Sequence, residues 1–271
     1  MSDFIREYLF ESRGRLSQSS LERYGRSFKA FLKYLGDREL EDLSTRLITA
    51  FACGRLADGV LPESVNLDLR HVKAALNKAY RWELIPKPVH VEMVRTPKRL
   101  PRHLTPEQFQ KILDAESIPA FKRLWTFLVW TALRRNEALN LTWDRVTYGP
   151  SPHVRVVGKG DQERIVPLMP PAVAALGEPR ESGPVFDFKN PVQVTKRFKH
   201  TAVKAGLSEH RLHDLRHSGI SWLVGRGAPL KLVQDFAGHS TILTTMNYVK
   251  IYPGDSYETL LKICGFKDEE K

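Results

Sequence analysis

Apolar side chains recur at helical spacing through the first third of the chain. The clearest run follows Ser19 and Glu22, which fit a capping box, and it ends at Gly36. Its apolar positions are Leu21, Tyr24, Phe28, Phe31, Leu32 and Leu35. Three further helices are expected over residues 3–11, 44–57 and 62–80. The pattern therefore predicts a bundle of four short helices over residues 1–85.

Residues 86–102 interrupt this pattern with prolines and basic side chains. Four prolines alternate there with five lysines and arginines. Because proline ends helices and stiffens linkers, we expect a basic interdomain linker over 86–102 that could follow a phosphate backbone. A second domain is then expected over 103–271, beginning where Thr105 and Pro106 supply a helix cap and a proline at the first helical position.

The second domain combines helical and strand patterns. A hairpin is expected from His153–Val157, a turn at 158–161 and a return strand over Arg164–Leu168. Helices are expected near 105–115, 120–133, 135–141, 191–205, 213–225, 229–237, 240–250 and 256–264. The predicted fold is mainly α with a small β-sheet: a helical N-terminal domain followed by a mixed α+β domain.

Composition narrows the class of protein. The longest apolar stretch, Leu124–Leu133, has ten residues, whereas a membrane span needs about 20. Residues 2–7 mix acidic and basic side chains and show no secretory signal, so a cytoplasmic, nucleoid-associated protein is expected. Cys53 and Cys264 lie 211 positions apart and are expected to be reduced, inert thiols.

The charge of the chain is strongly basic and evenly spread. Lys and Arg number 42 against 31 Asp and Glu, which gives a net charge of +11. Residues 1–100 carry +5 of this charge and residues 101–271 carry +6. A chain that is basic throughout suits a polyanion in contact with both domains, above all nucleic acid, although charge alone also fits an ordinary basic protein.

Six side chains form the candidate chemistry. They are Arg134 after an apolar helix, Lys159 on the hairpin turn, His213 and Arg216 on one helical face, His239 at a helix start, and Tyr248 nine residues later. Taken singly, each has an ordinary structural explanation, such as a buried ion pair, a helix cap, a solvated turn or a core aromatic ring. Together they combine a phenol with fixed cations and include no carboxylate cluster, which favours phosphodiester chemistry.

The physical reason lies in the charge that develops at phosphorus. Guanidinium forks match two non-bridging oxygens of a phosphodiester under attack, and preset donors stabilise that transition state. A phenol with a pKa of about 10 can be deprotonated by a nearby base and is also a tolerable leaving group. A lysine on the turn, Lys159, could protonate the departing 5′-oxygen.

A metal site is the main alternative for the histidines. His213 and His217 lie four residues apart, the spacing of a metal pair. However, Asp214 stands where a zinc protease carries Glu, and Arg216 is a poor neighbour for a divalent ion. We therefore expect no metal and no cofactor. The run Gly158-Lys159-Gly160 is not a phosphate-binding P-loop, because the spacer and the following Ser or Thr are missing.

The ordered set of motifs resembles the tyrosine recombinases, the family of phage integrases and Xer-type enzymes. The resemblance implies a core-binding SAM-like domain, a catalytic domain and six catalytic residues: Arg134, Lys159, His213, Arg216, His239 and the nucleophile Tyr248. Spacings of 26 residues from His213 to His239 and of 9 from there to Tyr248 are family-like. Glu137, three residues after Arg134, is expected to orient an arginine.

The chain departs from the family's pattern at several positions, none of which removes a catalytic group. The family commonly has Gly where Ala132 stands, Leu where Ala237 stands and His where Lys250 stands. Gln162 replaces a frequent second hairpin lysine, and Asp144 directly follows Trp143, one place earlier than usual. These differences concern the subfamily rather than the chemistry.

The resemblance implies a site-specific DNA recombinase that cuts duplex DNA through a 3′-phosphotyrosyl intermediate and a Holliday junction. Its partners would be a duplex recombination site, three further copies in a tetramer on two duplexes, and possible accessory proteins, but no membrane. The apolar segment 256–264 is expected to dock on a neighbouring subunit. Two alternatives stay open: a type IB topoisomerase-like enzyme that relaxes DNA, and a non-enzymatic DNA-binding regulator of the same fold.

Four further side chains are expected to face DNA phosphates: Lys196, Arg197, Lys199 and His200. Four large aromatic residues are assigned to the hydrophobic core rather than to base stacking: Trp125, Phe127, Trp130 and Trp143.

Overall fold

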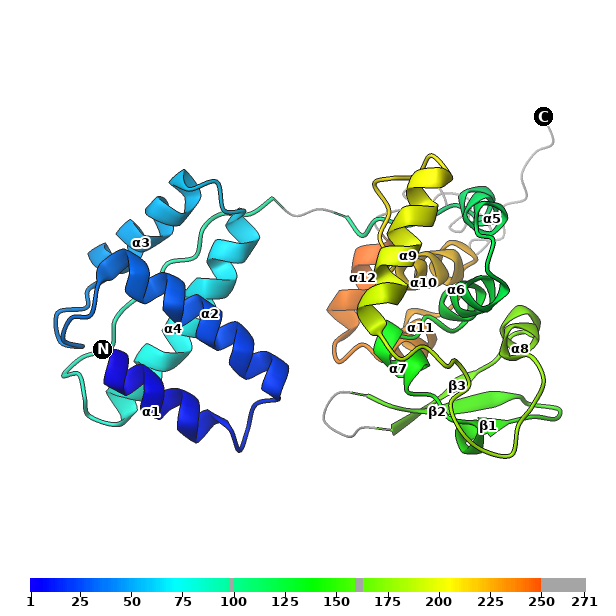
Figure 1. Cartoon of the computed structure of the whole chain (residues 1–271), viewed down its shortest axis with the longest axis horizontal. Coiled ribbons are helices and arrows are strands. Elements are labelled where there is room, and N and C mark those ends of the chain that lie inside the picture. The colour runs from blue at the N-terminus through cyan, green and yellow to red at the C-terminus, as the bar shows by residue number, and fades with distance from the viewer. Residues whose placement is uncertain (98–99, 159–162, 250–271) are drawn as a thin grey trace, which may run out of the picture. The chain divides into compact units, whose positions relative to one another are not determined.

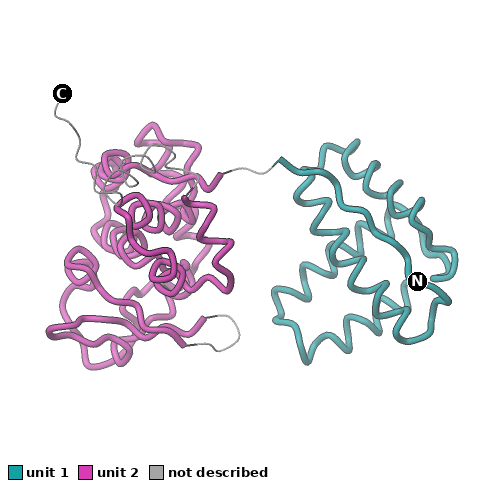
Figure 2. The backbone as a smooth tube through the Cα atoms, turned by 180° about the vertical axis from the view of Figure 1, so that it is seen from behind, with its two compact units in different colours: residues 1–98 teal, residues 99–271 magenta. Residues whose placement is uncertain are grey.

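Two separate hydrophobic cores form along the chain, one on each side of residue 98. The computed structural model describes residues 1–97, 100–158 and 163–249. It divides into two compact units, residues 1–98 and 99–271 (Figure 2). Each unit buries its own cluster of apolar side chains, from Phe4 to Val91 in the first and from Leu104 to Tyr248 in the second.

Four helices build the first unit, as predicted. They are α1 (Ser2–Ser12), α2 (Gln18–Leu35), α3 (Thr45–Ala57) and α4 (Pro62–Arg81) (Figure 1). The predicted cap Ser19 is wrong, because Ser17 caps α2 and accepts a hydrogen bond from the Ser20 amide. Gly36 ends α2 with a φ of +77°, a backbone conformation that favours glycine.

Part of the expected linker packs on this unit. Val91 is buried in its core, together with Ile85 just before the linker. The Asn66 side chain of α4 accepts from the Val94 amide at 2.8 Å and donates to the Val94 carbonyl at 2.7 Å. It therefore satisfies both main-chain hydrogen-bonding groups of Val94, which lies outside any helix or strand. The division at 86–102 stays a prediction, with its first residues held against α4.

Eight α-helices and one 3₁₀ turn are described in the second unit (Figure 1). They are α5 (Pro106–Ala115), α6 (Pro119–Thr131), α7 (Arg135–Leu139), η1 (Trp143–Arg145), α8 (Pro170–Leu176), α9 (Pro191–Lys204), α10 (Asp214–Gly225), α11 (Leu230–Ala237) and, in addition, α12 (Ile242–Val249). The predicted cap at Thr105 is confirmed, with Gln108 completing a capping box. Helix α6 lies centrally, in contact with α8 and α10. The predicted core positions Trp125, Phe127 and Trp143 are buried, and Trp130 packs against them.

A three-stranded antiparallel sheet in the order β1-β2-β3 completes this unit. Its strands are β1 (Val146–Thr147), β2 (His153–Val157) and β3 (Glu163–Pro167). Val154 pairs with Val166 and Arg155 with Ile165. The valine pair is buried and the other pair exposed, so alternate side chains face the core. The predicted mainly α fold with a small sheet is confirmed, whereas β1 and α8 were not predicted. No helix among the described residues is long and apolar enough to cross a membrane.

One buried ion pair connects α9 to the turn between α5 and α6. Glu116 is 1% exposed and accepts hydrogen bonds from Arg197 at 2.9 Å and from the Thr201 hydroxyl at 2.9 Å. Burial by itself raises the pKa of Glu116, but the bonds from Arg197, the Ile118 amide and Thr201 outweigh it and lower the pKa to about 2. The Arg197 guanidinium is thus held by Glu116, and the expected contacts of Lys196, Arg197, Lys199 and His200 with DNA stay predictions.

Candidate active site

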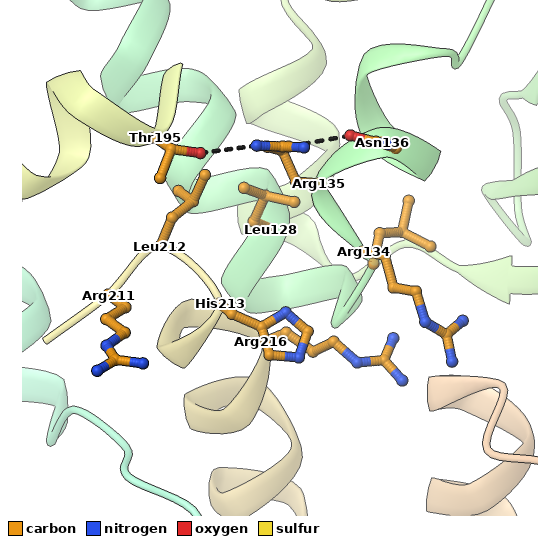
Figure 3. A pocket seen from close by; sticks show the side chains of 10 residues that line it. Leu128, Arg134, Arg135, Asn136, Thr195, Arg211, Leu212, His213 and Arg216 are labelled. Atoms are coloured by element: carbon orange, nitrogen blue, oxygen red, sulfur yellow. Dashed lines mark hydrogen bonds between the residues drawn. The ribbon is translucent and has the colours of Figure 1, made fainter. Parts of the chain in front are cut away.

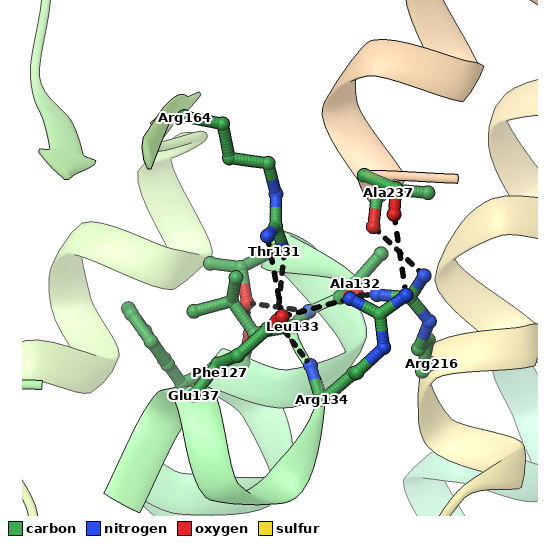
Figure 4. Close-up of polar contacts among 10 residues, drawn as sticks. Phe127, Thr131, Ala132, Leu133, Arg134, Glu137, Arg164, Arg216 and Ala237 are labelled. Atoms are coloured by element: carbon green, nitrogen blue, oxygen red, sulfur yellow. Dashed lines mark hydrogen bonds and ion pairs between the residues drawn. The ribbon is translucent and has the colours of Figure 1, made fainter. Parts of the chain in front are cut away.

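Arg216 is held deep in the second unit by main-chain atoms. It is 3% exposed and donates to the carbonyls of Ala132 at 2.5 Å and Ala237 at 2.7 Å (Figure 4). These carbonyls end α6 and α11, where the helix dipole is negative and favours a cation. Burial and the nearby Arg134 lower the pKa of Arg216 to about 10, so it still carries its charge at neutral pH.

The close approach of α10 to α6 places Arg216 at this position. A side chain on Gly219 would put its Cβ 2.0 Å from the Val129 carbonyl oxygen of α6, a contact that no real Cβ makes. Glycine therefore allows the two helices to touch. The Ser218 hydroxyl, which accepts from the Leu104 amide at 2.8 Å, ties α10 to the segment before α5. Helix α10 is consequently a fixed support for the side chains at its start.

Arg134 follows directly after the same end of α6. Helix α6 ends at Thr131, and the next residue, Ala132, has a φ of +50° that turns the chain so that Arg134 caps α7. The Arg134 guanidinium donates to Glu137 at 2.8 Å and to the Gly238 carbonyl at 3.2 Å. Its side chain stays 44% exposed, so one face of the guanidinium remains open to a ligand.

Glu137 connects Arg134 to a second arginine that was not predicted. Its carboxylate also accepts two hydrogen bonds from Arg164 of β3, at 3.2 and 2.8 Å (Figure 4). Burial raises the pKa of Glu137, but the bonds from Arg164 and Arg134 dominate and lower it to about 2, so Glu137 is ionised. The predicted orienting role of Glu137 is confirmed. A possible signal for Arg164 was a cation on the core-facing side of a strand, beside the buried Val166.

Gly238 makes room for this cluster at the end of α11. Its φ of +66° suits glycine, and an added Cβ would lie 2.7 Å from the Arg164 guanidinium carbon. Both Ala237 and Gly238 therefore present their carbonyls to the arginines while the chain turns toward His239.

A cavity of about 470 Å³ opens beside these cations. Its lining includes Arg134, His213 and Arg216, which point toward the same space from two parts of the chain (Figure 3). Arg135 and Arg211 border it as well. Desolvation and the charge of Arg216 lower the pKa of His213. The cavity combines several positive groups with a neutral imidazole, which suits an anionic ligand such as a phosphodiester.

Tyr248 is buried on α12. It is 2% exposed, and its hydroxyl lies 2.5 Å from Nδ1 of His217. Burial raises the pKa of Tyr248 to about 12, although the charge of Arg216 acts to lower it. The phenol is thus close enough to Arg216 for its pKa to respond to that charge. Because the pKa is about 12, the phenol is protonated at neutral pH.

His239 stacks on the same ring. Its imidazole is nearly parallel to the Tyr248 ring, with 6.1 Å between the centroids, and its Nδ1 is 2.9 Å from the buried Thr245 hydroxyl. Burial, followed by the charges of Arg216, Arg134 and Arg164, lowers the pKa of His239 to about 4. His239 is consequently a neutral ring in a strongly positive environment.

The structure thus gathers five of the six predicted residues around one cluster: Arg134, His213, Arg216, His239 and Tyr248. Lys159 lies outside the described residues, as do Gln162, Lys250, Cys264 and the segment 256–264. Sequence reasoning considered His217 only as a metal ligand and missed its contact with Tyr248. Among the residues that the structure describes, no group of three His, Cys, Asp or Glu side chains could hold a metal ion.

Two family models match the chain. The model described as "Phage integrase family" matches residues 102–254, and the one described as "Phage integrase, N-terminal SAM-like domain" matches residues 4–83. Tyrosine recombinase XerD of Haemophilus influenzae is 28% identical over 275 residues, covering 92% of this chain and 92% of the relative.

Solved structures share the fold. A lambda integrase dimer bound to a COC′ core site has a TM-score of 0.77 at 20% identity, covering 92% of this chain and 94% of the other. A lambda integrase tetramer bound to a Holliday junction has a TM-score of 0.76 at 21% identity, covering 91% and 76%. At these identities the likeness concerns the arrangement of the backbone.

Proposed function

The chain belongs to the phage integrase family, and we propose that it cuts and rejoins duplex DNA at a specific site through a covalent bond to Tyr248. It is a tyrosine-type site-specific DNA recombinase, an enzyme that breaks and rejoins DNA strands. The observation that carries the assignment of its residues is the cavity in which Arg134, His213 and Arg216 converge, with the Tyr248 phenol close enough to Arg216 for its pKa to respond to that charge.

The two arginines bind the scissile phosphate in this proposal. The open face of Arg134 and the buried guanidinium of Arg216 both carry fixed positive charge toward the cavity. Because their partners already hold them in place, little reorganisation is needed when negative charge develops on the non-bridging oxygens. His213 and His239 complete the set of donors around the phosphate.

Tyr248 is the nucleophile. Its phenolic oxygen attacks phosphorus, the bond to the 5′-oxygen breaks, and a 3′-phosphotyrosyl ester and a free 5′-hydroxyl result. Lys159 supplies the proton to the departing 5′-oxygen. Attack of a 5′-hydroxyl from a partner duplex then restores the DNA backbone and forms a Holliday junction.

Four copies acting on two duplexes are the proposed assembly. One support is the lambda integrase tetramer whose fold this chain shares. Another is the exposed apolar surface of α12, where Leu243 is 68% exposed and Met246 is 45% exposed, which suits contact with a neighbouring subunit. Accessory proteins and association with the nucleoid are part of the proposal and depend on the target site.

The test is to recover DNA trapped on the protein in cells and to sequence its ends, with Tyr248→Phe as the control. We expect wild-type protein to enrich one short sequence and the variant to enrich none, although the variant still binds that sequence as a purified protein. Suicide substrates built on the site should then give an adduct that survives denaturation, and intact duplexes should give four-way junctions. An adduct from Tyr248→Phe would refute the nucleophile, and relaxation of supercoils without junctions would favour a topoisomerase.

A further inference from the structure

The side chain closest to the Tyr248 hydroxyl belongs to none of the six residues assigned above. His217, one helical turn after His213 on α10, places its Nδ1 2.5 Å from that oxygen. The Tyr248 ring lies with its centroid 5.7 Å from that of His217. This is a short hydrogen bond between two side chains that are both largely removed from solvent.

The direction of this hydrogen bond follows from the two protonation states. A phenol whose pKa is raised to about 12 by burial holds its proton at neutral pH and acts as the donor. The pKa of His217 is lowered to about 4, mainly by burial. Smaller contributions come from the charges of His213, Arg216, His239 and His103. A neutral His217 with its proton on Nε2 therefore offers Nδ1 as the acceptor.

The fixed position of α10 makes this contact a property of the site. His217 directly follows Arg216, so the same helix that holds the buried arginine also sets the place of the imidazole. The rings of His213 and His217 meet edge to face at 4.7 Å, which restricts rotation of His217. Tyr248, in turn, is the residue of α12 whose hydroxyl meets α10.

We propose that His217 orients the Tyr248 hydroxyl and takes its proton when the phenolic oxygen attacks the scissile phosphate. This inference rests on the proposed function. In the step, the bond from Oη to phosphorus forms, the proton of Oη moves to Nδ1 of His217, and the bond from phosphorus to the 5′-oxygen breaks. The imidazolium of His217 returns the proton to Tyr248 when a 5′-hydroxyl displaces it.

Binding of DNA favours this transfer. Five titratable or charged groups act on His217. His213 and Arg216 belong to the start of α10, and His103 to the segment before α5. His239 lies in the α11–α12 turn and Tyr248 on α12. Most of them are cations or imidazoles that oppose a proton on His217. A phosphodiester in the cavity offsets their charge and raises the affinity of His217 for a proton.

The test compares adduct formation by wild type and His217→Asn on a suicide substrate, as a function of pH. Asparagine can accept the hydrogen bond but cannot take a proton, so we expect a rate about 10²-fold lower at neutral pH. The wild-type rate should fall as the pH drops through the pKa of His217, and this acidic limb should be absent from the variant, whose rate should rise with hydroxide.

A second substrate separates the two ends of the reaction. A 5′-bridging phosphorothiolate has a leaving group that needs no acid, so it should restore the rate of Lys159→Met but not that of His217→Asn. Rescue of His217→Asn by this substrate would place the residue at the leaving group and overturn the proposal. A faster adduct in His217→Asn would also overturn it, because His217 would then only restrain the tyrosine.

His71→Asn is the matched control. His71 lies in the first unit, with Nδ1 2.8 Å from the Ser27 hydroxyl and its ring stacked on Tyr24 at 3.9 Å, so it makes the same kinds of contact away from the cavity. Its adduct rate should match wild type. Melting temperature and DNA binding are measured for every variant. An adduct rate for folded His217→Asn equal to wild type would refute the inference, whereas failure of wild type to form an adduct would refute the proposed function.

Discussion

Ala132 holds a backbone conformation that an L-residue other than glycine adopts at a cost. Its φ is +50° and its ψ +25°, and its side chain is fully buried at the end of α6. A left-handed conformation costs a residue with a Cβ about 1–2 kcal/mol relative to glycine. The family commonly carries glycine at this position, and the geometry explains why glycine suits it.

Ala132→Gly should therefore raise the free energy of unfolding by about 0.5–1 kcal/mol, because relief of the left-handed conformation exceeds the entropy that glycine adds to the unfolded chain. Urea unfolding at neutral pH measures the change. Ala202→Gly is the control, since Ala202 is equally buried inside α9 and its loss should destabilise the chain by about 1 kcal/mol. Destabilisation by both substitutions would contradict the explanation.

Much of the candidate site was predictable because its residues lie in short motifs with characteristic spacing. Arg134, His213, Arg216, His239 and Tyr248 come from four segments that a pattern along the chain can order. Contacts between those segments were not predictable. The hydrogen bond from Tyr248 to His217 depends on how α12 meets α10, and that of Arg164 with Glu137 depends on which face of β3 meets α7.

The ion pair of Glu116 and Arg197 shows how one charged contact can position a helix. Glu116→Gln should lower the free energy of unfolding by about 1–3 kcal/mol at pH 7, because the amide cannot match the charge of Arg197. The pKa of Glu116 is lowered from 4.5 to about 2 on folding, so its contribution is present above pH 4.5 and is lost as the pH falls toward 2.

Urea unfolding between pH 7 and pH 3 measures this dependence. The gap between wild type and Glu116→Gln should narrow as the pH falls below 4.5. Glu181→Gln, which removes a carboxylate from an exposed position, should leave both the stability and its dependence on pH nearly unchanged. A gap that stays constant to pH 3 would show that the charge of Glu116 has no part in the stability.

Most helices were predicted to within a few residues, including α7 with five residues, whereas α8, η1 and β1 were missed. Helix α8 has seven residues and begins with two prolines, which indicate a break in the chain rather than a helix. Strand β1 has two residues and exists through its pairing with β2. The cap of α2 was misplaced because Ser17, Ser19 and Ser20 are all suitable, and only the path of the chain selects Ser17.

The positive charge of the whole chain governs how it should bind its substrate. Residues 1–100 and 101–271 share the net charge of +11 almost equally, so both parts are expected to contact phosphates. Affinity for a duplex should therefore fall steeply with salt, with log K decreasing by about 0.9 per phosphate neutralised for each unit of log salt. The slope is measured from equilibrium binding constants between about 50 and 300 mM salt.

The full chain is used for this measurement, because both parts carry the positive charge. It is tested with a specific duplex and with an unrelated one. Both duplexes should give steep slopes, because phosphate contacts are independent of sequence. A flat response with the specific duplex would contradict a binding mode in which phosphates dominate.

The hydrogen bonds from Arg216 to two main-chain carbonyls have a consequence for which substitutions the site tolerates. A peptide carbonyl is not removed when a side chain is replaced, so any residue that the buried backbone at positions 132 and 237 tolerates keeps these two oxygens. This chain has alanine at both, where its family commonly has other residues, and still keeps the arginine in place. The binding site for the Arg216 guanidinium is thus formed by the path of the backbone. Substitutions that keep this path at residues 132 and 237 leave Arg216 in place.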